Sequence, residues 1–395
     1  MLPFRYLFWV SWGLIFYTYF LFPLLLACFV ALKRGAQKTS KAERTETDSS
    51  PALPRVAMVV AAYNEAGVLA AKLSNTWAID YPADRFEILI GSDGSSDATN
   101  AILSACDDPR LHPYLFAQRR GKISVLNDLM SHVASDIVVM SDANTMFAPD
   151  AVRKLVNHFE DPQIGCVSGE LSLEQEGGVS GEGLYWKYEN WIKRNESRLG
   201  FLIGCNGGIF AIRRELYEAL PASTIVEDFV LSMRILERGH KVIIEPEAHA
   251  VEPACATAKA EMVRKIRIGA GNWQALGLNR AVLHPRFGLR SFAFWGHKVL
   301  RWMVPLFFLA AVGACLALLR EPFYSVALAL QAAGAILAVC ASYPRIGNRL
   351  PRITRPISYF YLMNYALLRG FFRYLFGTQR VTWERAAGPK EGNER

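Results

Sequence analysis

Residues 56–65, with the sequence VAMVVAAYNE, form an apolar run that ends in three polar residues. Two further runs have the same form: residues 86–97, FEILIGSDGSSD, and residues 137–144, IVVMSDAN. Each run has the length of a buried parallel strand, which carries apolar side chains on both faces. Since ligands bind at the carboxyl ends of the strands in open α/β sheets, the polar residues after each run are predicted to line one crevice.

Stretches with the composition of helices separate these runs. Residues 65–77 and 123–133 are two of them, and Pro149 opens another that runs to Phe159. Strands that alternate with helices predict right-handed βαβ units and a mainly parallel, Rossmann-like sheet. The apolar runs after residue 164 follow a less regular order, which predicts a more mixed second half of the domain.

Acidic side chains in one crevice repel each other, so a shared cation is expected there, most simply a divalent metal that carries a phosphorylated substrate. Asp142 and Asn144 stand at positions i and i+2 after a strand, and both can reach one hard cation. They are therefore the predicted ligands of Mg²⁺ or Mn²⁺. Asp93 heads a Gly-Ser turn and is predicted to accept a hydrogen bond from a base or ribose.

Other charged residues can serve the chemistry of a diphosphate substrate. Glu227 and Asp228 stand at the start of a predicted helix. One of them is expected to accept hydrogen bonds from the free N–H groups of the first helical turn. The other is a candidate general base for a sugar or lipid hydroxyl. Lys122, and Arg264 with Arg267 on one helix face, can supply positive charge to the diphosphate. The alternative for these basic residues is a stripe that faces lipid headgroups.

The N-terminal end is predicted to cross a membrane. Residues 4–32 contain Arg5 as their only charge and are long enough to span a bilayer, which needs about 20 apolar residues. An uncleaved export signal is the alternative. Lys and Arg cluster beyond this run, which marks the cytoplasmic side of a span. We therefore predict a transmembrane helix at 1–34, a polar linker at 35–54 and a cytosolic domain at 55–282.

Residues 299–378 are predicted to contain two or three further spans. The apolar segments are 299–319, 323–343 and 357–376. The last segment contains Arg369 and Arg373, which are costly in lipid. It is therefore predicted to span, to re-enter the membrane or to lie at its surface. This layout indicates a multi-pass protein of the inner (plasma) membrane.

Composition also assigns the segments on either side of the C-terminal spans. Residues 283–298 mix aromatic and basic side chains, which predicts an amphipathic helix in the headgroup layer, with an ordinary surface helix as the alternative. Residues 379–395 are a polar tail.

Most basic residues flank apolar segments, so the net charge of +8 indicates contact with membrane lipids and not with nucleic acid. None of the 7 cysteines forms a CxxC pair, and neither a zinc site nor a disulfide framework is predicted.

Together these residues resemble the membrane-bound glycosyltransferases of family 2, which have a GT-A catalytic domain and are related to cellulose, hyaluronan and poly-N-acetylglucosamine synthases. The resemblance covers residues 55–280 by motif and the whole chain by the layout of its apolar segments. It implies an α/β GT-A cytosolic domain with α-helical transmembrane segments. It also implies a nucleotide-sugar donor and a divalent metal.

The resemblance assigns roles to single residues. Asn64, Glu65, Asp93 and Lys122 match the nucleotide-binding set, and the further predicted contacts of the nucleotide sugar are Tyr63, Asp142, Arg264 and Arg267. Asp142 and Asn144 match the DxD-type metal motif, with Asn in place of the last Asp. Asn206 and Gly207 lie where the family lines its acceptor site.

One motif departs from the family. Processive members carry Gln-x-x-Arg-Trp on a helix at the membrane surface, and that Trp stacks on the acceptor sugar. The matching stretch here is residues 264–268, RKIRI, which keeps the Arg and lacks both Gln and Trp. Trp273 follows further along the helix. Transfer of a single sugar is therefore at least as well supported as processive synthesis.

The sequence thus predicts an inverting, metal-dependent glycosyltransferase of cell-envelope or exopolysaccharide synthesis. Its expected donor is a UDP-linked sugar, and its expected acceptor is lipid-linked or a polysaccharide. Asp228 matches the catalytic base of the family, with Glu227 beside it. The alternatives are a processive synthase with polysaccharide-assembly partner proteins, a non-catalytic assembly or transport subunit, and a nucleotidyl or phosphosugar transferase to a lipid.

Overall fold

The structure is a computed structural model that describes residues 1–38, 53–174, 180–254, 257–347, 349–351 and 353–380. The chain divides into two compact units. The sheet unit consists mainly of Ala36–Gln175 and Ser197–Glu261. The helical unit consists of Met1–Gly35, Glu176–Glu196 and Met262–Gln379.

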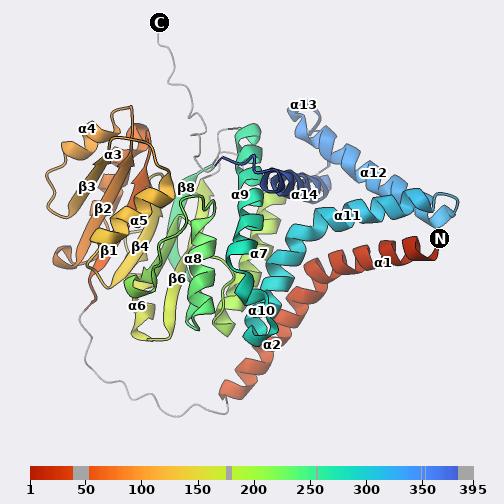
Figure 1. Ribbon diagram of the computed structural model, residues 1–395, viewed down its shortest axis with the longest axis horizontal. Helices are drawn as coiled ribbons and strands as arrows, with labels where there is room; N and C mark the ends of the chain where they lie inside the picture. The colour runs from red at the N-terminus through yellow and green to blue at the C-terminus, as the bar shows by residue number, and fades with distance from the viewer. Residues whose placement is uncertain (39–52, 175–179, 255–256, 348, 352, 381–395) are drawn as a thin grey trace, which may run out of the picture. The chain divides into compact units, whose positions relative to one another are not determined.

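The sheet unit contains one eight-stranded sheet in the order β3-β2-β1-β4-β7-β6-β8-β5 (Figure 1). The first four strands pair in parallel and are β1 (Val56–Ala62), β2 (Phe86–Asp93), β3 (Leu111–Phe116) and β4 (Ile137–Asp142). The helices between them are α3 (Ala66–Trp77), α4 (Thr99–Ser104) and α5 (Lys122–His132). All residues of β1 are buried, as expected for a central strand covered on both faces. The predicted alternation of strands and helices is confirmed.

The second half of the sheet is mixed, as predicted. β7 (Ile209–Arg213) pairs antiparallel with β4 and with β6 (Ile164–Glu174). β6 then pairs parallel with β8 (Lys241–Pro253), and β8 pairs antiparallel with β5 (Met146–Phe147). The helices of this half are α6 (Ala151–Asn157) and α8 (Glu227–Glu237). Short 3₁₀ turns lie at Ala83–Arg85, His158–Glu160 and Arg214–Leu216.

Apolar side chains of the central strands and α3 build the core on one side of the sheet, among them Met58, Val60, Leu69, Ile88 and Val139. Gly91 of β2 matters for the opposite packing. A Cβ at this position would collide with the Val125 side chain of α5 and lie 3.2 Å from Leu129 Cδ1. The glycine therefore lets α5 lie directly on β2, and this contact places the first turn of α5 near the carboxyl ends of the strands.

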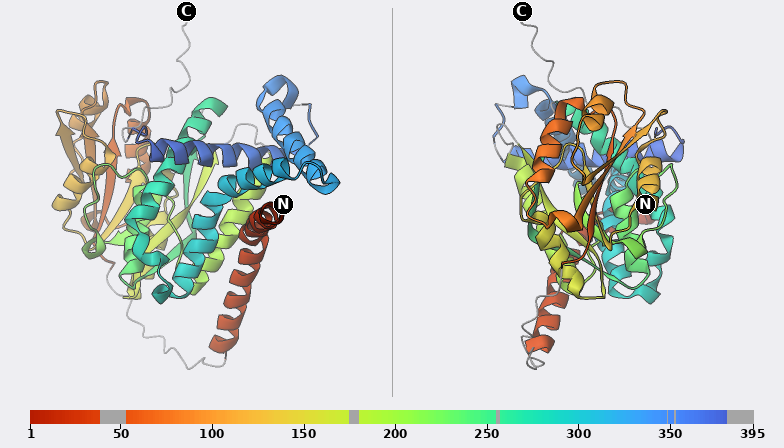
Figure 2. Two further views of the ribbon diagram at one scale, coloured as in Figure 1. Left: turned by 45° about the vertical axis from the view of Figure 1, so that its right-hand side comes forward. Right: turned by 90° about the vertical axis from the view of Figure 1, so that its left-hand side faces the viewer.

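The helical unit begins with α1 (Leu2–Phe16) and α2 (Phe22–Lys38), which a π-helical turn, Tyr17–Leu21, joins into one long helix (Figure 2). The other long helices are α7 (Ser180–Leu199), α9 (Ala258–Leu278), α11 (Leu300–Ala317), α12 (Pro322–Ser342) and α14 (Thr354–Leu375). Shorter elements are 3₁₀ turns at Arg280–Leu283 and Pro285–Phe287, α10 (Leu289–Ala293), a π-helical turn at Phe294–Val299 and α13 (Pro344–Gly347).

Three helices in the described part of the chain are long and apolar enough to cross a membrane: Leu2–Lys33, Leu289–Ala317 and Pro322–Ser342. They match the predicted N-terminal span and two of the predicted C-terminal segments, so the chain has the helices of a membrane protein. α14, which covers the third predicted segment, is not among them.

The predicted domain boundaries stay predictions. Residues 289–298 continue into the helix Leu289–Ala317, and their predicted place in the headgroup layer is not tested. Most of the predicted linker and most of the predicted tail lie outside the described residues.

Buried charges of the helical unit are paired with one another. Glu189 of α7 accepts hydrogen bonds from Lys298 Nζ at 2.9 Å and from Arg301 Nη1 at 2.5 Å. His297, which is fully buried, lies between Glu189 and Glu196. These pairs explain how a long apolar helix accommodates basic residues, because a buried charge is tolerated when it is paired and hydrogen-bonded.

Candidate active site

The carboxyl ends of β1, β2 and β4 meet at one edge of the sheet. In the register, Ala62 of β1 is level with Ser92 of β2, and Ala61 is level with Asp142 of β4. The polar turns that follow these strands are therefore brought together, as the positions of the apolar runs predicted.

Asn64 links the turn after β1 to the turn after β2. Its Oδ1 accepts a hydrogen bond from the Ser96 N–H at 2.8 Å, and its own N–H donates to Ser95 Oγ at 3.1 Å. Its φ of 54° lies in the left-handed region, which Asn enters more readily than most residues. Next to it, the Glu65 N–H donates to Thr99 Oγ1 at 2.9 Å. The predicted Tyr63-Asn64-Glu65 motif thus lies at the expected edge.

The Tyr63 ring is covered by a cation that we did not predict. The Arg119 guanidinium lies 3.7 Å from the ring centre, which is the geometry of a cation–π contact. Its neighbour Arg120 lies over Phe116 at 4.2 Å instead. Nothing local in the sequence distinguishes these two arginines, so only the fold shows which of them reaches the predicted nucleotide-binding residues.

Asp93 holds the loop that leads into α5. Its side chain is only 1% exposed, and its two oxygens accept the N–H groups of Arg120 at 2.7 Å and Gly121 at 2.8 Å. Gly121 has a φ of 93°, which favours glycine. Direct contact of Asp93 with a base or ribose stays a prediction, and this burial weighs against it. The observed bonds fix the position of Lys122 instead.

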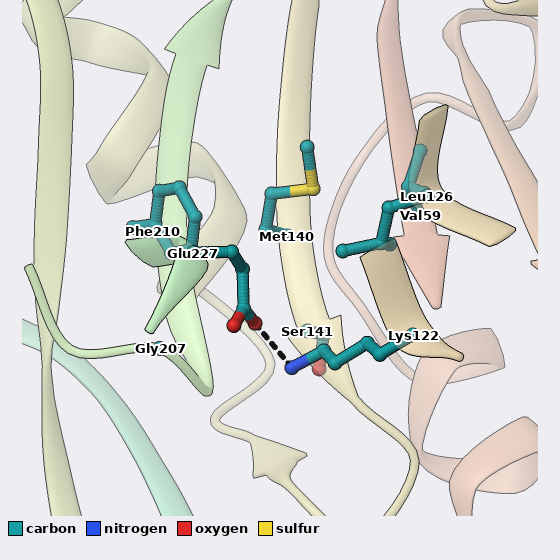
Figure 3. Close-up of a pocket in the computed structure, with 8 residues that line it drawn as sticks. All are labelled: Val59, Lys122, Leu126, Met140, Ser141, Gly207, Phe210 and Glu227. Carbon is teal, nitrogen blue, oxygen red and sulfur yellow. Dashed lines mark ion pairs between the residues drawn. The ribbon is translucent and has the colours of Figure 1, made fainter. Parts of the chain in front are cut away.

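Lys122 bridges two acidic residues at the centre of the site. Its Nζ lies 2.5 Å from Asp142 Oδ1 and also pairs with Glu227 Oε1. Figure 3 shows the pair of Lys122 and Glu227 within a small pocket. Burial alone would lower the pKa of Lys122, but the charges of Asp142 and Glu227 more than offset it, so the pKa lies above its ordinary value. The pocket is lined by Val59, Lys122, Leu126, Met140, Ser141, Gly207, Phe210 and Glu227.

Asp228 has the properties of a general base. Burial, and next the charge of Glu227, raise the pKa of Asp228 to about 6. A carboxylate with such a pKa is ionised near neutral pH and is a stronger base than an ordinary one. Gly207 lies directly against it, since a Cβ on Gly207 would be 3.1 Å from Asp228 Oδ2. Any larger residue at position 207 would press on this carboxylate.

Asn206 fixes the loop in which Gly207 lies. It is 8% exposed, its N–H donates to Ser168 Oγ at 3.0 Å, and its Nδ2 donates to Gly169 O at 2.6 Å. The side chain is thus bound to the backbone of β6. Its predicted contact with an acceptor stays a prediction.

Comparison with known proteins identifies this region. Residues 57–220 match the family model described as Glycosyl transferase family 2. Residues 57–220 thus form a domain of the family 2 glycosyltransferase type. The match includes the predicted residues from Tyr63 to Gly207 and ends before Glu227 and Asp228.

Two kinds of curated relative align with this chain at 27% identity. One is beta-monoglucosyldiacylglycerol synthase from Synechocystis sp., aligned over 233 residues, 56% of this chain and 48% of the relative. The other is poly-beta-1,6-N-acetyl-D-glucosamine synthase from Staphylococcus aureus, aligned over 207 residues, 50% of this chain and 49% of the relative. The chain thus spans about half the length of the curated relatives it matches.

A solved structure shares the fold of the glycosyltransferase domain and its helices. It is a mannosyltransferase from Pyrobaculum calidifontis in complex with GDP-Man and Mn²⁺, with a TM-score of 0.70 and 23% identity. The similarity covers 94% of this chain and 99% of that chain. The predicted GT-A fold is confirmed.

The residues of the glycosyltransferase domain fit a metal that is shared with a substrate. Asn144 Nδ2 donates to Glu252 Oε1 at 3.2 Å, which brings a second carboxylate to the turn that contains Asp142. No group of three His, Cys, Asp or Glu side chains within the described ranges could hold a metal by itself. The arrangement suits an ion such as Mg²⁺, which takes one or two carboxylates from the protein and its other ligands from phosphates and water.

Two predicted residues lie outside the sheet unit, and one further residue was missed. Arg264 and Arg267 lie on the part of α9 that belongs to the helical unit, and their contact with a nucleotide sugar stays a prediction. Glu252 was not predicted. It stands 108 positions from Asn144, and no motif surrounds it.

Proposed function

We propose that the protein is an inverting glycosyltransferase that moves a sugar from a nucleoside-diphosphate sugar to a hydroxyl group of its acceptor. One observation carries this proposal: Lys122, Asp142 and Glu227 are joined at the carboxyl edge of a family 2 domain, with the raised-pKa carboxylate of Asp228 adjoining Glu227. A binding subunit has no need of a carboxylate that is tuned to accept a proton near neutral pH.

The donor half of the site has to hold a nucleotide and neutralise its diphosphate. Tyr63 with Arg119 offers a ring and a planar cation to the nucleotide, and Lys122 offers a positive charge to the diphosphate. Asp142 and Asn144, with Glu252 near them, would hold Mg²⁺ or Mn²⁺. When bound, such an ion supplies charge that stabilises the leaving diphosphate. A UDP-linked sugar is the donor that we expect.

The acceptor half contributes the base. Asp228 takes the proton from the acceptor hydroxyl while the oxygen of that hydroxyl attacks the anomeric carbon. The bond from the anomeric carbon to the diphosphate oxygen breaks, and the nucleoside diphosphate leaves. Attack from the side opposite the leaving group inverts the anomeric centre in one displacement. Gly207 leaves room for the acceptor oxygen beside Asp228, because it carries no side chain there.

The proposed acceptor is a lipid-linked saccharide or a polysaccharide. The printed names of the two groups of relatives describe a diacylglycerol glycolipid synthase and a polysaccharide synthase. Transfer of a single sugar is the version that we favour. The Trp273 ring packs against Phe371 of α14, with ring centres 4.9 Å apart, so a residue of its own unit covers part of this ring. Processive synthesis is the second candidate.

We further propose that the domain faces the cytoplasm from the inner membrane. With three crossing helices and the N-terminus outside, the glycosyltransferase domain and the C-terminal tail lie on the same cytoplasmic side. Basic residues follow the first and third of these helices, in agreement with the positive-inside rule. Four spans would instead leave the basic tail outside. The test is to fuse to the C-terminus a reporter enzyme that is active only in the periplasm. Activity of this reporter would contradict the proposed topology.

Metal-dependent release of nucleoside diphosphate tests the proposed function. Purified membranes are supplied with a panel of nucleotide sugars, Mn²⁺ or Mg²⁺ and a lipid extract. We expect one donor to yield nucleoside diphosphate. A chelator should abolish this release and added Mn²⁺ should restore it, because Asp142 and Asn144 provide few ligands and the ion is therefore easily removed. Nucleoside monophosphate or pyrophosphate would indicate a nucleotidyl or phosphosugar transferase. No release with any donor would favour the non-catalytic subunit.

The pH profile of transfer provides a second test. The base acts only when it has lost its proton, and burial together with Glu227 raises the pKa of Asp228 to about 6. We therefore expect kcat/KM to rise with pH through about 6 and then to level off. In Glu227→Gln the repelling charge is gone, so this rise should move to lower pH. A rise that stays in place would mean that another group controls it.

A further inference from the structure

Lys72 is a buried lysine beneath the Asp142–Asn144 turn. It lies on α3 and is 1% exposed, which is rare for a lysine. Its Nζ donates to Ser141 Oγ at 2.7 Å and to Thr145 O at 2.6 Å. It also lies 4.8 Å from the centre of the Phe147 ring. The amine is thus bonded to uncharged oxygens, and it forms no ion pair with a carboxylate of the described residues.

The two acceptors of Lys72 stand on either side of the proposed metal ligands. Ser141 precedes Asp142, and Thr145 follows Asn144. The Thr145 N–H also donates to Asp142 O at 3.2 Å, which closes the turn. One amine therefore joins the start and the end of the segment from which both candidate ligands extend. Rotation of this turn would have to break both bonds of Lys72.

The same amine is linked to the acceptor side of the site. A Cβ on Gly208 would lie 2.8 Å from Thr145 Oγ1, so Thr145 is in close contact with the loop that contains Gly207. Lys72 therefore supports a segment that adjoins both the proposed metal ligands and the proposed acceptor loop.

A purely structural lysine would be a poor choice at this position. Burial lowers the pKa of Lys72 to about 7, with the charge of Asp142 acting in the opposite direction. The cost of burying an amine is unnecessary for packing alone, since an apolar side chain of similar length fills such a space without it. On α3 the residue occupies the face of Leu69 and Leu73, where the helical period calls for an apolar residue.

We propose that Lys72 is a positioning residue, which holds the Asp142–Asn144 turn in the geometry that binds a divalent metal and the donor diphosphate. This inference rests on the proposed function. Lys72 touches neither substrate nor metal in this scheme, and it acts through Ser141 and Thr145. Groups that orient metal ligands in this way typically change metal affinity or activity by about 10- to 100-fold when they are removed.

The test compares Lys72→Met with Leu73→Ala in the full-length protein. Met keeps the length of the side chain and removes the amine, whereas Leu73→Ala removes apolar packing from the same helix and keeps the amine of Lys72. Mn²⁺ binding to the protein with nucleoside diphosphate is measured by calorimetry. Amide hydrogen exchange is measured for the peptide that covers residues 141–145. For Lys72→Met we expect about 10- to 100-fold weaker Mn²⁺ binding and faster exchange in that peptide, while Leu73→Ala keeps the wild-type affinity.

Each outcome of this test decides something. Wild-type Mn²⁺ affinity and exchange in Lys72→Met would overturn the proposal, and so would equal losses of affinity in both variants. If Lys72→Met does not fold, Ser141→Ala removes one acceptor and should weaken Mn²⁺ binding in the same direction; an unchanged affinity would then overturn it. A wild-type protein that binds no Mn²⁺ and releases no nucleoside diphosphate would instead refute the proposed function, whatever the exchange data show.

Discussion

Replacing Asp228 by Asn should abolish most sugar transfer while leaving the fold and donor binding in place. We expect kcat to fall by about 100- to 10,000-fold, the range that a general base contributes. Asn has almost the same shape as Asp, so it preserves the packing of Gly207 against position 228. It cannot accept the proton of the acceptor hydroxyl. Removal of a buried carboxylate beside Glu227 also relieves a repulsion, so no loss of stability is expected.

The measurement has to separate chemistry from binding. Donor affinity is determined by calorimetry in the presence of Mn²⁺, and transfer is followed as released nucleoside diphosphate with a saturating acceptor. Glu237→Gln, at the other end of α8, makes the same chemical change on the same helix and should keep full turnover. Near-normal turnover in Asp228→Asn would remove Asp228 from the mechanism. A lost donor affinity would assign it to binding instead.

The sequence predicted which polar residues meet at one edge of the sheet, because this depends on local order. Tyr63, Asp93 and Asp142 each follow or end an apolar run, and parallel strands with in-register ends must bring such residues to one edge. The parallel half of the sheet follows from the same runs, whereas the GT-A fold was implied by the resemblance to the family. The mixed second half of the sheet was predicted only as irregular, because antiparallel pairing such as that of β4 with β7 joins distant segments.

The contacts that sequence reasoning missed depend on distant partners. The oxygens of Asp93 bind the backbone of the loop before α5, 27 and 28 positions away, which was not predicted, and its contact with a nucleotide stays a prediction. Glu252 reaches Asn144 across the fold in the same way. Lys72 did leave a sign in the sequence, since a charged residue interrupts the apolar face of a helix. Such an interruption predicts a buried partner but does not say which one.

Replacing Lys122 by Met should both destabilise the domain and stop transfer. Lys122 is the cation that pairs with Asp142 and Glu227, and without it these carboxylates and Asp228 repel one another. Breaking a buried ion pair by removing one partner costs about 3–5 kcal/mol. Because the Lys122 side chain is 20% exposed, we expect the lower end, about 3 kcal/mol. Transfer should fall as well, since the diphosphate loses its cation.

The same substitution, Lys122→Met, should strengthen the binding of Mn²⁺ although it weakens the fold and stops transfer. In the wild-type protein the Lys122 ammonium occupies one oxygen of Asp142, so an incoming cation has to compete with it. Without the ammonium, Mn²⁺ should bind more tightly in the absence of donor and should raise the melting temperature of Lys122→Met more than that of the wild type. Calorimetry and thermal unfolding with and without Mn²⁺ measure both effects.

A second substitution shows whether the charge, and not the packing, is responsible. Glu227→Gln in the Lys122→Met background removes one of the carboxylates left without a partner, so it should recover part of the lost stability but none of the transfer. In the wild-type background the same substitution removes an ion pair and should destabilise. This change of sign is the signature of a direct interaction between the two residues. Equal effects in both backgrounds would mean that the Lys122–Glu227 pair contributes nothing to folding.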